Sequence, residues 1–211
     1  MPRRRTLLTA LLAWASLAPW SAVGEGVYDT LRIEAVPPVG AADGSSDGRW
    51  TILLDGYIDA LAPTRLGALV AQQGITEADV YFNSPGGSLI AGMEIGRLLR
   101  QRGYAAHVGK RTADVNELVG GVCYSACPFA YAGGVQRHLE FDSALGVHRA
   151  ENRVPLPDGD AFEKLMSQQA TEYLLAMGVS PELFAIMSQV PHDEIRGLTR
   201  EEARRLMLVN Q

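Results

Sequence analysis

The chain has 211 residues, of which 47% are hydrophobic and 20% are charged, and its formal net charge is −5. This balance is that of a globular protein, and the length is sufficient for one hydrophobic core. The excess of acidic residues argues against nucleic acid or an anionic membrane surface as a partner. We therefore expect one folded domain.

The N-terminus predicts a secretory signal peptide over residues 1–24. Three arginines at positions 3–5 precede a stretch of 15 uncharged residues from Thr6 to Trp20, the pattern of a basic n-region followed by an apolar h-region. A membrane-spanning helix needs ~20 residues. The small residues Ala22 and Gly24 place the cleavage near Gly24. Cleavage there would leave 16 basic residues against 24 acidic ones, a net charge of −8. We expect an exported, periplasmic or secreted protein, the alternative being a membrane anchor formed by an uncleaved N-terminal segment.

The mature chain is expected to divide into an N-terminal strand and flexible loop at residues 25–49 and one α/β domain at residues 50–211. Strands are predicted over Val27–Val36 and Trp50–Ile58, and we expect the loop Gly40–Gly48 between them to be the most mobile part. Next come a helix, a strand and a second helix, over Pro63–Gln73, Ala78–Asn83 and Leu89–Arg102. The second helix is predicted to bury four side chains, those of Ile90, Met93, Leu98 and Leu99.

Shorter elements follow. Tyr104–Val108 is predicted as a strand, Ala126–Ala132 as a short buried helix, and Gln136–Val147 as two strand pieces joined near Asp142 and Ser143. From Asp160 onward the pattern becomes helical, with helices at about 160–177, 180–189 and 199–207. The order of elements predicts an α/β fold, a parallel sheet with crossover helices and a C-terminal helical region.

Three segments carry residues suited to chemistry. Gly86 and Gly87 lie where a strand ends and a helix begins, and paired glycines let the backbone turn sharply and present an N–H group to a ligand. Ser125 opens the predicted short helix, where N–H groups favour a developing anion, although serine at that place is commonly a helix cap. His148 ends a strand and could act as a general base, although histidine there is more often simply packed or solvated.

In this order the three segments resemble the Clp protease proteolytic subunit (ClpP) family and its relatives of the ClpP/crotonase fold. The resemblance covers roughly residues 50–209 and rests on the glycine turn, the nucleophile segment, the histidine strand and the closing helix, found here at Ser84–Gly87, Ser125–Ala126, Gly146–His148 and Leu198–Ala203. It implies a ClpP/crotonase-like fold with Ser125 as nucleophile and His148 as general base. It also implies an oxyanion hole formed by the N–H groups of Gly87 and Ala126.

The sequence departs from the family at two places near this candidate site. The family's acid lies shortly before the closing helix, where this chain has Met187 or Pro191. Asp193 is the nearest carboxylate and is a candidate to orient His148, with an acid-free Ser/His pair as the alternative. The segment Gly109–Val122 makes the interval between glycine turn and serine longer by roughly nine residues, and such an insertion could serve as a lid, a specificity loop or a plug.

Cys123 and Cys127 are the two cysteines of the chain and flank Ser125. Their spacing places both sulfurs on one side of a helical turn if the helix already starts at Cys123, and an exported chain meets an oxidising compartment. The pair is therefore either a disulfide that holds the nucleophile turn or two buried free thiols. A cysteine nucleophile is a further alternative, although neither position matches the family's nucleophile.

No metal or cofactor is expected. His107, His138 and His192 are scattered, without the spacing to cysteine or carboxylate that metal sites show. The glycine-rich segments lack the Gly-Lys-Ser/Thr ending of a phosphate-binding loop, so no nucleotide site is implied.

The function predicted from the sequence is that of a serine peptidase acting on a peptide or protein substrate. One alternative is a catalytically decayed binding or scaffold protein of the same fold. Another is an acyl-thioester enzyme of the related crotonase type, which export away from cytosolic coenzyme A disfavours. Because no ATP is expected outside the cytoplasm, we predict no ATPase partner, and we predict a homo-oligomer formed through residues 160–177.

Overall fold

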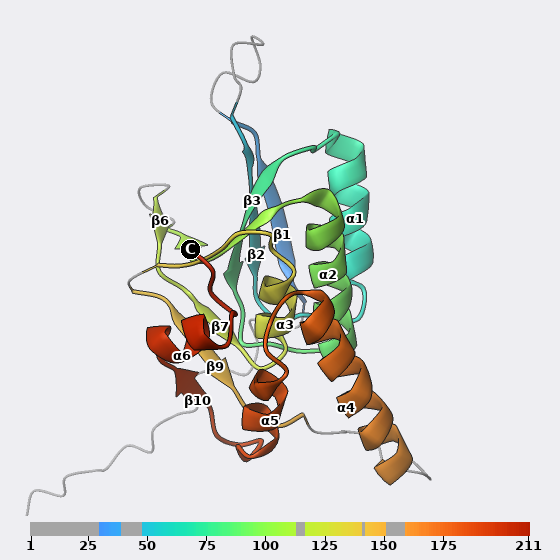
Figure 1. The fold of residues 1–211 in the computed structure, drawn as a ribbon. Helices are drawn as coiled ribbons and strands as arrows, with labels where there is room; N and C mark the ends of the chain where they lie inside the picture. The colour runs from blue at the N-terminus through green and yellow to red at the C-terminus, as the bar shows by residue number, and fades with distance from the viewer. Residues whose placement is uncertain (1–29, 39–47, 113–116, 141, 151–158) are drawn as a thin grey trace, which may run out of the picture.

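The computed structural model describes residues 30–38, 48–112, 117–140, 142–150 and 159–211. In these residues helices pack against sheets that contain parallel strands, which confirms the predicted α/β class (Figure 1). The predicted signal peptide and nearly all of the loop at 40–48 lie outside the described residues. No helix in the described ranges is long and apolar enough to cross a membrane.

The central sheet has five strands in the order β1-β2-β3-β4-β8. Their bounds are Arg32–Val36, Trp50–Asp55, Ala78–Asn83, Ala105–Val108 and Arg137–Leu139. Strands β2, β3, β4 and β8 are parallel, as predicted, whereas β1 is antiparallel to β2. Antiparallel neighbours do not require the crossover connection that parallel neighbours need.

Helices α1 (Ala62–Gln73) and α2 (Leu89–Arg102) connect β2, β3 and β4 and lie on one face of the central sheet (Figure 1). Of the face predicted to be buried in α2, Met93 and Leu99 are buried and Leu98 packs partly buried against the core, but Ile90 is 47% exposed. The prediction for Ile90 was wrong because this residue lies in the first turn of α2 and lines an open hollow rather than the core.

A second sheet of three strands has the order β10-β9-β7 and is formed by Arg196–Leu198, Ala144–Val147 and Val122–Tyr124. Strand β7 is parallel to β9, and β10 is antiparallel to β9. Ser84 joins the two sheets, because its N–H group donates to the carbonyl of Val122 and its carbonyl accepts from the N–H group of Tyr124. The end of β3 therefore lies beside β7.

The C-terminal region contains the three predicted helices, α4 (Gly159–Ala176), α5 (Glu182–Ser188) and α6 (Arg200–Arg205), with β10 between the last two. The buried guanidinium of Arg137 ties this region to the central sheet by donating to the carbonyl oxygens of Gly134, Met207 and Leu208. Self-association through residues 160–177 stays a prediction.

The insertion at 109–122 contains a short hairpin, β5 (Lys110–Arg111) and β6 (Leu118–Val119), whose turn at 113–116 lies outside the described residues. Arg111 donates to a carboxylate oxygen of Glu34 in β1 at 2.8 Å, so the hairpin is held against the central sheet. This described part precedes the amino end of β7, whereas Ser125 follows the carboxyl end of the same strand.

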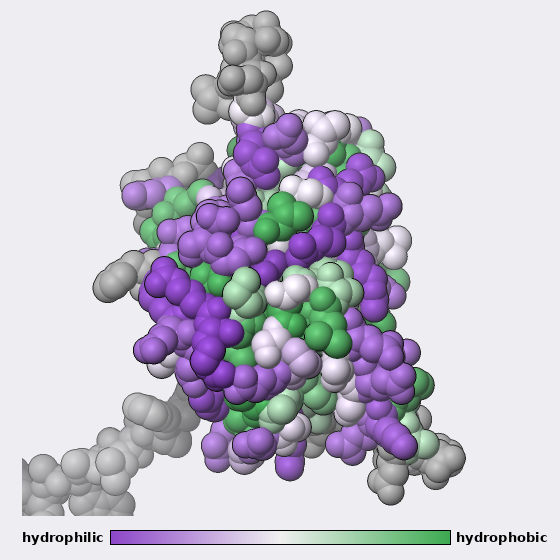
Figure 2. All heavy atoms as spheres, viewed as in Figure 1, coloured by the Kyte–Doolittle hydropathy of each residue, from purple (hydrophilic) through white to green (hydrophobic). Residues whose placement is uncertain are grey.

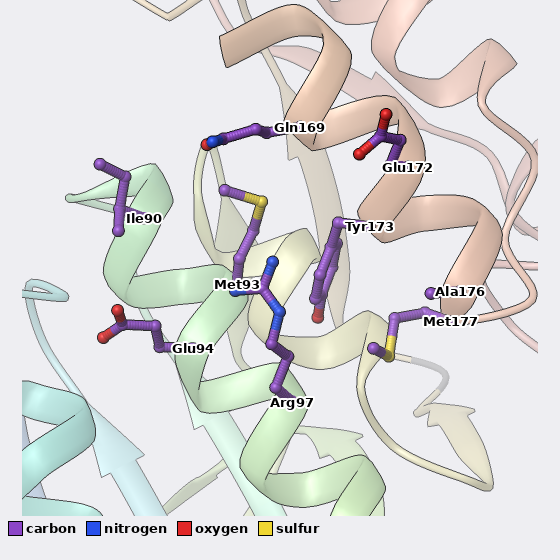
Figure 3. Close-up of a pocket in the computed structure, with 9 residues that line it drawn as sticks. All are labelled: Ile90, Met93, Glu94, Arg97, Gln169, Glu172, Tyr173, Ala176 and Met177. Atoms are coloured by element: carbon purple, nitrogen blue, oxygen red, sulfur yellow. The ribbon is translucent and has the colours of Figure 1, made fainter. Parts of the chain in front are cut away.

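An open hollow of about 490 Å³ lies between α2 and α4, with the side chains of Met93, Arg97 and Tyr173 inside it (Figure 3). The guanidinium of Arg97 lies 5.2 Å from the centre of the Tyr173 ring, a cation–π contact. Figure 2 shows hydrophilic residues over most of the viewed face, with a hydrophobic patch near the upper end of α4. Neither Ser125 nor His148 lines the hollow.

Candidate active site

Ser125 occupies a sharp turn between β7 and the buried helix α3 (Cys127–Ala132). Its φ angle is 59°, a left-handed conformation that residues other than glycine seldom adopt and that costs about 1–3 kcal/mol. The N–H group of Ser125 donates to the carbonyl of Gly146 at 3.0 Å, which fastens the turn to β9. The N-cap of α3 is Ala126, with no side-chain capping bond, so Ser125 is not a helix cap.

The glycine turn after β3 packs directly on this serine. Gly86 and Gly87 have φ angles of 109° and 142°, which only glycine adopts readily. A Cβ atom on Gly86 would lie 2.5 Å from the Cβ of Ser125, and one on Gly87 would lie 2.3 Å from the carbonyl oxygen of Ile58. Both glycines are therefore required by the space available as well as by the turn.

Two backbone N–H groups beside Ser125 are unpaired. Those of Gly87 and Ala126 have no hydrogen-bond acceptor among the described residues. A Cβ on Gly86 would lie 3.1 Å from the nitrogen of Ala126, so the glycine turn and the residue after Ser125 are in contact. Unpaired donors next to a serine hydroxyl can bind the negative oxygen that develops when a carbonyl is attacked.

His148 follows β9 and is buried, with 9% of its surface exposed. Its Nδ1 lies 2.9 Å from the carbonyl oxygen of Arg149. Because a carbonyl oxygen only accepts, Nδ1 carries the proton and Nε2 is left as the nitrogen that can take one. Burial lowers the pKa of His148 below 6.5, and the nearby His192 lowers this pKa further, against the opposing effect of the Arg149 carbonyl.

Ser125 and His148 are brought to the same edge of the second sheet. Strands β7 and β9 are parallel with Tyr124 opposite Gly146, so both side chains follow neighbouring carboxyl ends. No hydrogen bond joins the Ser125 hydroxyl to His148 in the described part of the chain. Such bonds are often long in ligand-free sites and shorten when substrate binds.

Asp193, the candidate acid, is exposed in the connection between α5 and β10. Within the described ranges it forms no hydrogen bond or ion pair with His148. The ring that contacts His148 belongs to its neighbour, His192, with the ring centres 4.9 Å apart and the planes at 83°. This contact was not predicted from the sequence, in which the one indication is that His192 adjoins Pro191, where the acid was expected.

Cys123 and Cys127 form a disulfide with their Cα atoms 5.1 Å apart, which confirms the bridged alternative. Both residues are fully buried. The helix does not start at Cys123, the condition under which the spacing places both sulfurs on one helical turn, because Cys123 lies in β7 and Cys127 is the first residue of α3. It closes a small loop around Ser125.

The remaining candidate histidines lie elsewhere. His107 and His138 are paired across β4 and β8, and their rings stack 4.5 Å apart. Tyr81 of β3 stacks on the other side of His107 at 4.6 Å, and the Asp79 carboxylate lies 3.7 Å from His107. The described residues contain no group of three or more potential ligands that could hold a metal ion.

The described residues form an α/β fold, and the comparisons with known proteins bear on that fold. No family model matches the sequence, and no curated protein matches it. Among solved structures, the chain is similar to a mutant of the 1510-N membrane-bound stomatin-specific protease, with a TM-score of 0.51 and 14% identity over 75% of each chain. At this identity the similarity shows the fold alone.

Replacing Gly86 with alanine should disturb the turn at Ser125. The new methyl group would collide with Ser125 and push its hydroxyl away from the unpaired N–H groups. We expect the reaction of Ser125 with a fluorophosphonate probe to slow by about 10² or more. Gly74→Ala is the matched control, since Gly74 also has a positive φ but has open space around it; equal labelling of both variants would contradict this account.

Removing the disulfide with Cys123→Ala and Cys127→Ala together should destabilise the fold. For so short a loop the chain-entropy relation gives about 2 kcal/mol, and the loss of two buried sulfur atoms adds a packing cost. Urea unfolding of the double variant and of the oxidised parent measures the difference. A double variant as stable as the parent would show that the bridge does not support the turn.

Proposed function

We propose that this chain is an exported, ATP-independent serine peptidase in which Ser125 is the nucleophile and His148 is the general base. The observation that carries the proposal is the left-handed Ser125, held at the end of β7 beside two N–H groups that have no acceptor in the described part of the chain. The protease-like fold of the chain agrees with it. The substrate class we propose is a peptide or protein.

The proposed reaction begins when the Ser125 hydroxyl oxygen attacks a substrate carbonyl carbon and Nε2 of His148 takes the hydroxyl proton. The N–H groups of Gly87 and Ala126 donate to the negative oxygen that forms, and each such donor contributes a rate factor of about 10²–10³. His148 then gives the proton to the leaving amine. Water attacks the acyl-serine by the same steps and releases the product acid.

The third role, orienting His148, is assigned in this proposal to the backbone of Arg149. Its carbonyl accepts the Nδ1 proton at 2.9 Å and so selects the tautomer that a general base needs. This is the acid-free Ser/His pair. The exposed Asp193 is the competing orienter, and it would have to move to reach the imidazole.

Export is part of the proposal and is supported by the buried disulfide, since disulfides persist mainly in oxidising compartments. The absence of an ATPase partner follows from export, because no ATP supply is expected there. Assembly through α4 is proposed as well and agrees with two exposed leucines on that helix, Leu165 and Leu175.

The proposal is tested by treating the mature chain, residues 25–211, with a fluorophosphonate probe. We expect the parent to be labelled and both Ser125→Ala and His148→Ala to lose labelling by at least about 10³, because the residues act as a unit. Asp193→Asn should label at the parental rate if the Arg149 carbonyl orients the base. Circular dichroism of each variant shows whether it is folded.

Two results would change the assignment. A folded parent that is not labelled and cleaves no peptide would favour the decayed binding or scaffold protein, which the missing Ser125–His148 hydrogen bond also favours. Loss of labelling in Asp193→Asn would return the orienting role to the carboxylate.

The labelling rate should depend on pH through His148. Because burial lowers the pKa of His148 below 6.5, the imidazole stays neutral and able to accept a proton at pH values where a solvated histidine is already charged. The rate should therefore be constant near neutral pH and fall as pH decreases, with a midpoint below 6.5. A rate profile between about pH 4 and pH 8 measures this, and a midpoint above 6.5 would contradict the described environment.

A further inference from the structure

The connection between α5 and β10 is held against the end of β9 on both sides of His192. On one side the N–H group of Arg149 donates to the carbonyl of Val190 at 3.0 Å. On the other side Arg196 pairs with Val147 in the antiparallel ladder. A turn closed by a hydrogen bond from Glu194 N–H to the carbonyl of Pro191 lies between them. The backbone that carries His192 is therefore fixed relative to His148.

The contact between the two imidazoles has a definite geometry. Their centres are 4.9 Å apart and their planes meet at 83°, an edge-to-face arrangement. Rings prefer this arrangement because the positive edge of one faces the negative face of the other. His192 is half-buried and His148 is buried, so the contact is shielded from water on the side of His148.

One hydrogen bond to His148 leaves part of its orientation unspecified. The bond from Nδ1 to the Arg149 carbonyl fixes the tautomer, but it comes from the adjacent residue and permits the ring to tilt about the bond. A second contact from a different element removes that freedom. In the described residues the ring contact made to His148 comes from His192.

We propose that His192 is a positioning residue for the general base: its ring, packed edge to face on His148, keeps the imidazole in the plane that directs Nε2 toward Ser125. This inference rests on the proposed function. A ring in this role orients the base by packing, whereas a carboxylate would also attract a proton to it. The pKa of His148 is lowered, first of all by burial.

The test compares His192→Ala with His192→Phe. Phenylalanine keeps a ring for the edge-to-face contact, whereas alanine removes it. With the fluorophosphonate probe, we expect the maximal labelling rate of His192→Ala to fall about tenfold with the half-saturating concentration unchanged, since misplacing a reacting group slows the chemical step. His192→Phe should stay within about threefold of the parent. His138→Ala is the control for losing a histidine, because His138 lies in the central sheet.

Two outcomes would overturn the positioning role. One is a His192→Ala variant that labels at the parental rate. The other is a His192→Phe variant as slow as His192→Ala, which would show that the ring contact is not what matters.

A separate readout keeps this inference distinct from the proposed peptidase activity. If the parent is not labelled, the proposed activity fails, and the NMR contacts of the His148 ring protons then decide the positioning role. One set of contacts, from a single ring orientation, in the parent and in His192→Phe, with contacts averaged over several orientations in His192→Ala, would support it. A single unchanged ring orientation in His192→Ala would end it.

Discussion

The left-handed backbone of Ser125 is the constraint on which the rest of the site depends. A serine at φ 59° is strained by itself, so its surroundings have to hold it. Its N–H group is bonded to Gly146, and Gly86 presses against its Cβ from the other side. The disulfide between Cys123 and Cys127 joins the two elements that the turn connects. Together these contacts hold the backbone of Ser125 in the left-handed conformation.

The two sheets meet beside the segment that leads to Ser125. Ser84 bonds to both Val122 and Tyr124, so the end of β3 continues into the second sheet. The glycine turn after β3 is thereby carried to the end of β7, where Ser125 lies. Strand β9 lies on the other side of β7 and supplies His148. Three segments far apart in the sequence meet because the carboxyl ends of parallel strands share one edge.

The helices and strands whose bounds were predicted well are those long enough for their hydrophobic residues to show a repeating pattern. The bounds of β3 and α2 agree with the prediction, since each has enough residues to show its period and α2 ends at a glycine. Strands β7 and β10 have three residues each and show no period. Ser125, His148 and the glycine turn were found as candidates because their residue types and order are informative. The contact between His192 and His148 was not found, because backbone hydrogen bonds in the connection between α5 and β10 bring the two rings together.

The way His148 is held bears on the kind of base it can be. A carboxylate partner would raise the pKa of an imidazole and strengthen its hold on a proton. Here the contacts to His148 come from the Arg149 carbonyl and the ring of His192, and burial lowers the pKa of His148. Such a base accepts a proton less strongly but stays neutral over a wider range of acid pH. In the proposed reaction, the geometry around Ser125 and the two N–H groups that have no acceptor among the described residues therefore matter more than the strength of the base.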